Sequence, residues 1–125
     1  MTEKNREKNE SFFQAGLGSL VIAWAAGVGM GFGTDLIGES QTRLSREFAI
    51  RGEVQSAADI LKSMYIVNPR LLALEGEVGT LAPGARGDVV ISRQNPLEKI
   101  ECLADSGNAL SHVIQAGQVV RGEVS

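Results

Sequence analysis

The hydrophobic positions near the N-terminus repeat with a helical period. One stripe of an amphipathic helix is formed by apolar residues at spacings of i, i+4, i+7, i+8 and i+11: Phe13, Leu17, Leu20, Val21 and Trp24. From Gly27 the period breaks into a short, uniformly apolar run that is punctuated by glycines. The pattern predicts a helix to about residue 26, a turn at Gly27 and a strand over 28–33, apolar on both faces as in a parallel sheet.

The same region carries no charged residue between positions 11 and 34. A run of about 20 apolar residues would suffice to cross a membrane. Six glycines and the polar Ser11, Gln14 and Ser19 argue against a membrane span. The first ten residues balance acidic and basic side chains, which argues against a secretory signal. We therefore expect a soluble helix–strand unit, although no second strand of the same kind lies nearby to pair with it.

The middle of the chain has a helical pattern. We expect a surface helix over 43–54, and a second helix after Ser56, which forms a capping signal together with Asp59. Asn68 and Pro69 predict the N-cap and first residue of a third helix, which would end at Gly76.

The last third of the chain has a β pattern. Pro83-Gly84 fits the centre of a type II turn, and residues 89–91 predict a short buried strand. A turn at 95–96 is followed by one or two helical turns over 97–103, and Ala116-Gly117 predicts a tight hairpin. The tripeptide Arg86-Gly87-Asp88 matches the triplet that integrins recognise in adhesion proteins. It falls at a predicted turn-to-strand junction, which favours a structural role.

Composition and charge narrow the classes of function. The 125 residues are 43% hydrophobic and 22% charged, as in an ordinary globular domain, but 15 of them are glycine. A net charge of −3 argues against a nucleic-acid partner, which requires clustered basic residues. The single cysteine, Cys102, forms no internal disulfide, and this predicts a reducing, cytoplasmic compartment.

One residue stands where chemistry is expected. Asp35 follows the C-terminal end of the predicted apolar strand, the end at which parallel α/β sheets gather their catalytic groups. A carboxylate there can bind a metal and accept a proton from metal-bound water, or it can simply cap a loop or helix. The only histidine, His112, is expected to have a structural or surface role. A hydrolytic zinc site needs three protein ligands, so this chain supplies at most part of such a site.

Several short motifs follow one another in a specific order and spacing: Gly31–Leu36, Asn68 with Leu71-Leu72 and Gly76, Gly79–Gly84, Asp88–Val90, Asn95–Leu97, Val113-Ile114 and Gly117. Together they resemble the C-terminal part of the amidohydrolase superfamily, in particular its imidazolonepropionase-like and Xaa-Pro dipeptidase-like enzymes. The similarity runs from about residue 12 onward. One departure is Ala116, since an Asp or Asn usually precedes the hairpin glycine in that family.

The resemblance implies a metal-dependent hydrolase of C–N bonds with an α/β fold. Residues 1–78 would form the terminal portion of a (β/α)8 barrel, and residues 79–125 the strands of a small β-sandwich. Asp35 matches the aspartate that ends the family's last barrel strand, where it is both a metal ligand and the general base. The implied cofactor is one or two divalent metal ions, with zinc expected first, and the implied substrate is a small amide, a dipeptide or a cyclic amide. The family's other ligands are histidines and often a carboxylated lysine, and they have no counterpart here.

A complete barrel needs about 250 residues, twice the length of this chain. We therefore expect the terminal segment of a longer amidohydrolase, which alone binds metal weakly or not at all and is inactive. The alternative is a non-catalytic remnant or complementation subunit whose strand edges pair with a partner chain. Neither a nucleic acid nor a membrane is expected as a partner. The substrate's identity, the number of metal ions and the oligomeric state stay open.

Overall fold

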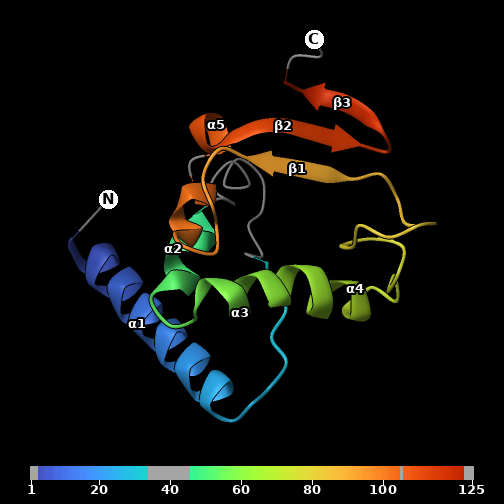
Figure 1. The fold of residues 1–125 in the computed structure, drawn as a ribbon. Helices are drawn as coiled ribbons and strands as arrows, with labels where there is room; N and C mark the ends of the chain where they lie inside the picture. Colours follow the sequence, from blue (N-terminus) through green and yellow to red (C-terminus); the bar gives the residue numbers. More distant parts are fainter. Residues whose placement is uncertain (1–2, 34–45, 105, 123–125) are drawn as a thin grey trace. The chain divides into compact units, whose positions relative to one another are not determined.

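The computed structural model describes residues 3–33, 46–104 and 106–122 (Figure 1). Contacts divide the chain into two compact units, Met1–Met30 and Gly31–Ser125.

The first unit is one helix. Helix α1 spans Glu3–Ala25 and ends in a Schellman motif. The N–H of Val28 donates to the carbonyl of Ala23, and the N–H of Gly27 donates to the carbonyl of Trp24. Gly27 has a φ of 69°, which a residue without Cβ adopts at no steric cost. The predicted helix and its turn are confirmed. No helix among the described residues has the length and apolarity that a membrane crossing requires.

The strand predicted over residues 28–33 does not form. A parallel strand exists only where neighbouring strands satisfy its backbone groups. All strands in the described part of the chain belong to one antiparallel sheet much later in the sequence. The prediction of a strand is therefore wrong for this structure, and the segment holds its place by other contacts.

Four short helical elements lie between residue 46 and residue 71. Helix α2 spans Arg46–Gly52, within the predicted helix, and helix α3 spans Ala57–Lys62. The side chain of Ser56 accepts a hydrogen bond from the backbone N–H of Asp59, so the predicted N-cap is confirmed. Helix α3 continues through a π-helical turn over Ser63–Val67 into helix α4, Asn68–Leu71.

Asn68 is not the N-cap that the sequence predicts. Its φ of −58° and ψ of −47° are helical, and its backbone N–H donates to the carbonyl of Ser63, five residues earlier. Pro69 has no N–H to donate and would clash with the carbonyl four residues back in a regular α-helix. The wider π turn accommodates Pro69, so one helix runs through this position where two were predicted. The helix also ends at Leu71, before the predicted stop at Gly76.

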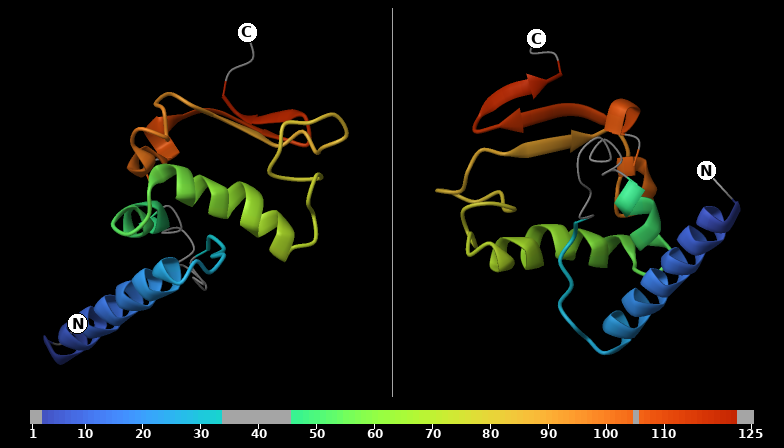
Figure 2. Two further views of the ribbon diagram at one scale, coloured as in Figure 1. Left: turned by 60° about the horizontal axis from the view of Figure 1, so that its bottom comes forward. Right: turned by 180° about the vertical axis from the view of Figure 1, so that it is seen from behind.

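The second unit also contains a small antiparallel sheet. Its strands are β1 (Val89–Ser92), β2 (Leu110–Gln115) and β3 (Gln118–Arg121), in the order β1-β2-β3. A 3₁₀ helix over Ile100–Ala104 and helix α5, Ser106–Ala109, connect β1 to β2. The continuous α3–α4 helix lies on one side of the sheet in both figures (Figure 2). This part of the fold is mixed α/β, and the expected division at residue 78/79 stays a prediction.

The turns predicted at Pro83-Gly84 and Ala116-Gly117 are confirmed. Gly84 has a φ of 86°, and the N–H of Ala85 donates to the carbonyl of Ala82 at 3.0 Å, as in a type II turn. Ala116 and Gly117 both have positive φ, 49° and 78°, as a type I′ hairpin turn requires. Strand β1, in contrast, is not buried as predicted. Val90 is 50% exposed and Ile91 is 44% exposed.

The apolar core of the described residues is small. The side chains buried in it are those of Ile60, Ile100, Cys102 and Ala109. They come from α3, the 3₁₀ helix and α5, and helix α2 packs against the same 3₁₀ helix. The core therefore holds the helices together and leaves much of the sheet without apolar cover.

The hairpin turn leads to a first prediction. Ala116 adopts a left-handed conformation that costs an L-residue about 1–2 kcal/mol, and asparagine tolerates it better. We expect Ala116→Asn to raise the free energy of unfolding by about 0.5–1 kcal/mol, measured by urea denaturation. The matched control is Ala82→Asn at an exposed turn residue that lacks positive φ, which should change stability by less than about 0.5 kcal/mol. Equal effects of the two substitutions would contradict the prediction.

Candidate functional site

Asp35, the predicted catalytic residue and metal ligand, lies outside the described residues. The structure does describe the segment that leads directly to it, residues 31–33. The candidate site is therefore built from the side chains that hold this segment.

Asn68 binds the main chain of Phe32 through both ends of its side-chain amide. The N–H of Phe32 donates to Oδ1 of Asn68 at 2.8 Å, and Nδ2 of Asn68 donates to the carbonyl of Phe32 at 2.9 Å. A neighbouring strand would offer the same donor and acceptor from its backbone. One asparagine side chain thus takes the place of a strand neighbour at Phe32.

Arg51 binds the preceding residue. Its Nη2 donates to the carbonyl of Gly31 at 2.6 Å. Two residues of the same helical region fix the guanidinium, since Nε donates to Glu47 at 2.8 Å and Nη1 donates to Oε1 of Gln55 at 3.1 Å. Arg51 is only 8% exposed, so its charge is paired with Glu47 and hydrogen-bonded rather than solvated.

The side chain of Phe32 adds an apolar contact to this anchor. Its ring lies 4.8 Å from the ring of Phe48, centroid to centroid. The guanidinium carbon of Arg51 lies 5.8 Å from the centroid of the Phe32 ring, within cation–π range. The main chain and the side chain of Phe32 are therefore held by different neighbours. We call Arg51, Asn68 and Phe48 with the segment 31–33 the Phe32 anchor.

One polar atom beside the anchor is unsatisfied. Nε2 of Gln55 is buried and has no hydrogen-bond partner among the described residues, although its Oε1 accepts from Arg51. Leaving an amide donor unpaired costs about 1–3 kcal/mol, so Gln55 is held in place at some cost to stability. The benefit is the acceptor that it provides to Arg51.

Sequence reasoning did not identify Arg51 or Asn68 as partners of this segment. The spacing Glu47, Arg51, Gln55 is a detectable signal, because residues four apart share one face of a helix. Nothing local indicates that the Asn68 side chain reaches a residue 36 positions earlier.

The other candidate residues do not form a metal site. Cys102 is buried in the 3₁₀ helix, and His112 lies on β2 opposite Ile91. Within the three described ranges, no group of three His, Cys, Asp or Glu side chains is arranged to hold a metal ion. The described part of this chain therefore does not fit a metal centre by itself.

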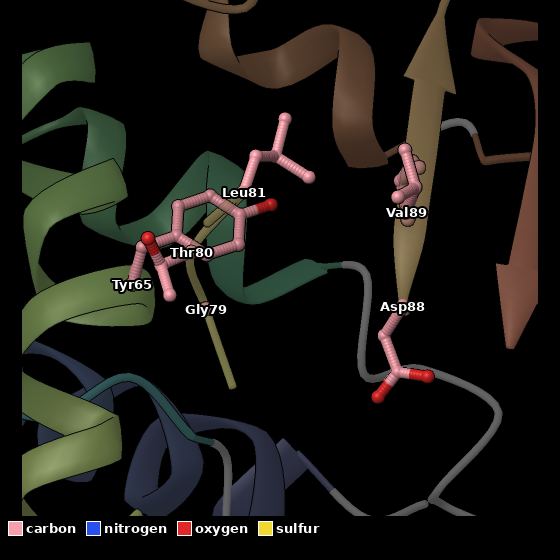
Figure 3. Close-up of a pocket in the computed structure, with 7 residues that line it drawn as sticks. Tyr65, Gly79, Thr80, Leu81, Asp88 and Val89 are labelled. Carbon is pink, nitrogen blue, oxygen red and sulfur yellow. The ribbon is translucent and has the colours of Figure 1, made fainter. Parts of the chain in front are cut away.

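A separate pocket of about 250 Å³ lies between the α3–α4 helix and strand β1 (Figure 3). It is lined by Tyr65, Gly79, Thr80, Leu81, Asp88, Val89 and Val90. Asp88 already accepts a hydrogen bond from the N–H of Ala116 at 2.8 Å and pairs with Arg86 at 3.1 Å. Tyr65 is 47% exposed, and the partial burial of its phenol raises the pKa above the ordinary value of 10.0. The pocket is largely apolar, and its one carboxylate is engaged in the hairpin turn.

The chain is similar in sequence and structure to parts of several solved hydrolase structures. The chain is similar to an amidohydrolase at 40% identity over 90% of its length, with a TM-score of 0.84. It is similar to a prolidase in complex with N-methylphosphonate-L-proline at 39% identity over 98% of its length, again with a TM-score of 0.84. A Xaa-Pro dipeptidase with methionine in its active site matches at 25% identity over 85% of the chain, with a TM-score of 0.76.

These matches confirm the predicted resemblance to amidohydrolases and Xaa-Pro dipeptidases. The chain spans 27% of the length of the amidohydrolase, 30% of the prolidase and 25% of the dipeptidase. No family model and no curated protein matches the chain.

The close approach at Gly31 allows a test of the anchor. A Cβ at this position would lie 2.8 Å from Cδ1 of Leu71 and 3.0 Å from Oδ1 of Asn68. The exposed Leu71 side chain can move aside, so the tight contact that remains is the one with Oδ1 of Asn68. We expect Gly31→Ala to lower the free energy of unfolding by about 1 kcal/mol, measured by chemical denaturation. Gly33→Ala is the matched control, because no atom lies within 4 Å of a Cβ there. A Gly31→Ala chain as stable as the control would show that the approach is not tight.

The Tyr65 phenol allows a pH test, since it is the only tyrosine of the chain. Its raised pKa means that the folded chain holds the phenolic proton more tightly than the unfolded chain does. Above pH 10.0, the unfolded chain therefore loses this proton before the folded chain does. Stability that is complete below this pH should decline as the pH rises through the folded pKa. Tyrosinate absorbance should show a midpoint above 10.0 in the native chain and near 10.0 in denaturant. Identical midpoints in the two states would contradict burial of the phenol.

Proposed function

We propose that this chain supplies the aspartate-bearing part of a metal-dependent amidohydrolase that cleaves C–N bonds of small amides, dipeptides or cyclic amides. The observation that carries the proposal is the similarity to an amidohydrolase and a prolidase at 39–40% identity across 90–98% of the chain. The prolidase binds a phosphonate analogue of a dipeptide that ends in proline. We therefore place dipeptides that contain proline first among the substrates to be tested.

Asp35 is the residue proposed to act in this chemistry, both as a metal ligand and as the general base. Supporting evidence is its position, two residues beyond the described segment 31–33 that the Phe32 anchor holds. One carboxylate cannot bind a catalytic metal ion alone, so the other ligands would come from residues outside this chain. Zinc is the proposed metal, and the cytoplasm is the proposed compartment.

The proposed fold also follows from the similarity to amidohydrolases. Residues 1–78 would contribute to a (β/α)8 barrel, and residues 79–125 would contribute strands to a β-sandwich. The antiparallel sheet β1-β2-β3 supports the second assignment, because β1 and β3 each have an unpaired edge within the described residues. Such edges offer backbone groups to further strands.

A second candidate function is a non-catalytic complementation subunit that pairs with a partner chain. The observation that favours it is the exposure of large apolar side chains on the second unit, among them Leu72 at 65%, Leu81 at 84% and Val120 at 57%. Exposed apolar surface of this kind is typical of an interaction site. The proposed enzyme would also need this surface to be covered by another part of the protein. The two candidate functions differ in whether Asp35 takes part in a reaction.

Reconstitution tests the proposal. The chain would be combined with a prolidase of the matched kind from which the corresponding 30% has been removed, and Xaa-Pro hydrolysis would be measured with added zinc. We expect turnover only when both pieces are present. Asp35→Asn should lower it by about 100-fold or more, because a carboxamide neither accepts the proton nor neutralises the metal's charge. The exposed Glu53→Gln is the control for loss of a charge.

Each result of the reconstitution has one meaning. Turnover that depends on Asp35 supports the enzyme proposal. A stable complex without turnover supports the complementation subunit, and turnover that is equal for Asp35→Asn and the parent chain overturns the role of Asp35. Turnover and stoichiometric zinc binding by the isolated chain would overturn the proposal that other ligands lie outside it.

A further inference from the structure

We propose that strand β1 pairs edge to edge with strand β1 of a second copy of this chain, in antiparallel orientation and through the backbone of Val90. The inference goes beyond the proposed function and does not depend on it, because it needs neither a metal ion nor a substrate. Strand β1 is an outer strand of the sheet β1-β2-β3, so one of its edges has no neighbouring strand among the described residues. Backbone groups on such an edge are a template for pairing with another chain.

The backbone of Val90 faces this outer edge. In an extended strand, the N–H and C=O groups of successive residues point alternately to the two sides. The carbonyl of Gly87 accepts from the N–H of Gly117 at 2.8 Å, and the N–H of Arg93 donates to the carbonyl of Ala109 at 2.7 Å. Residues 87 and 93 therefore face the β2 side, as do the odd positions between them. Val90, at an even position, points both backbone groups away from β2, where no described residue binds them.

The side chains of β1 do not oppose such pairing. Exposed edge strands usually carry charged residues or proline, which discourage contact with another strand. The sequence of β1 is Val-Val-Ile-Ser, with neither. Val90 is 50% exposed and Ile91 is 44% exposed, so the edge is both apolar and accessible.

The pocket beside β1 also favours an added strand. Tyr65 and Leu81 lie across this pocket of about 250 Å³ from Val89 (Figure 3). Leu81 is 84% exposed, so the apolar wall opposite β1 is itself uncovered. A second strand beside β1 would bring its own apolar side chains to this wall and remove part of its surface from water.

One register makes the edge complementary to itself. Two copies related by a two-fold axis at Val90 would exchange both backbone hydrogen bonds between the two Val90 residues, in the closed arrangement of a symmetric dimer. The side chains would then meet in these pairs: Val89 with Ile91, Asp88 with Ser92, Gly87 with Arg93 and Arg86 with Gln94. Each charged residue faces a neutral one, and the centre consists of β-branched pairs, which stabilise sheets.

The neighbouring registers lack this match. A shift by two residues in one direction would place Asp88 opposite the apolar Val90, and a shift in the other direction would place Arg93 opposite Val89. The register of a strand pair is set by such matching of side chains. The arrangement of charges at the two ends of β1 therefore favours a second copy of this chain as the occupant of the edge.

The first test measures association and hydrogen exchange of the 125-residue chain together. Sedimentation should show a dimer whose fraction rises between about 1 µM and about 1 mM protein. Exchange of the Val90 amide should slow by about tenfold or more over the same range, because its N–H becomes bonded only in the dimer. The amides of Val89 and Ile91 face β2, so they should exchange slowly at every concentration.

The second test places charges on the axis. Val90→Lys would set two like charges opposite each other and should raise the dissociation constant of the dimer by about tenfold or more. The matched control is Val120→Lys on β3, where the side chain is 57% exposed, and it should change the constant by less than about twofold. An equimolar mixture of Val90→Lys and Val90→Glu should associate as tightly as the parent chain, which a merely structural effect of either substitution would not produce.

Every outcome decides the inference. Exchange at Val90 that slows with concentration, together with rescue in the mixed pair, supports it. A chain that stays monomeric, or a dimer that Val120→Lys weakens and Val90→Lys does not, overturns it. Slow exchange at Val90 at every concentration would show a partner within the same chain. Slow exchange only after addition of the truncated prolidase would assign the edge to that enzyme, and would overturn the dimer while the proposed function stands. If Val90→Lys fails to fold, exchange in the parent chain decides alone.

Discussion

The pairing of the Asn68 amide with the main chain of Phe32 is the contact on which the arrangement of the second unit depends. It joins the segment that leads to Asp35 to a helix 36 residues later. The pairing requires Asn68 to lie inside the helix, where its side chain projects sideways rather than capping the first turn. The π turn before Pro69 makes this possible, because it continues the helix past a residue that cannot donate a backbone hydrogen bond.

The same stretch of helix also determines how the following loop approaches. A Cβ at Gly79 would lie 3.0 Å from both Cγ of Pro69 and the carbonyl oxygen of Tyr65, and Gly79 has a φ of 74°. Only glycine satisfies both conditions at low cost. The π turn therefore contacts two other segments, one at Phe32 and one at Gly79. It presents Asn68 to Phe32, and it gives the loop before β1 a backbone surface on which to pack, which closes one side of the Tyr65 pocket.

The parts of this fold that sequence predicts are those governed by near neighbours. The cap at Ser56, the turns at Pro83-Gly84 and Ala116-Gly117 and the end of α1 at Gly27 depend on atoms a few residues apart. The strand over residues 28–33, the cap at Asn68 and the burial of β1 were predicted wrongly, because each depends on distant partners, whereas β1 itself forms as predicted. The pattern at 28–33 is that of a strand, but a strand requires neighbours. Its position after the predicted strand and the family resemblance both identified Asp35 as a candidate, and only the structure identified the contacts that Arg51 and Asn68 make with residues 31 and 32.

The second unit has a small core and many exposed apolar side chains, which favours association with another surface in both candidate functions. Ile60 and Ile100 are buried with the helices, while Val90 and Ile91 on β1 are 50% and 44% exposed. Complete burial of such a side chain contributes about 1.5–3 kcal/mol, and about half of that remains to be gained at each of these positions when a second surface covers them. This gain offsets part of the entropic cost of association. In the proposed enzyme, the remaining metal ligands would come from the chain that covers this surface. Association and catalysis are therefore steps of one assembly in the enzyme, whereas in a complementation subunit association alone would be the function.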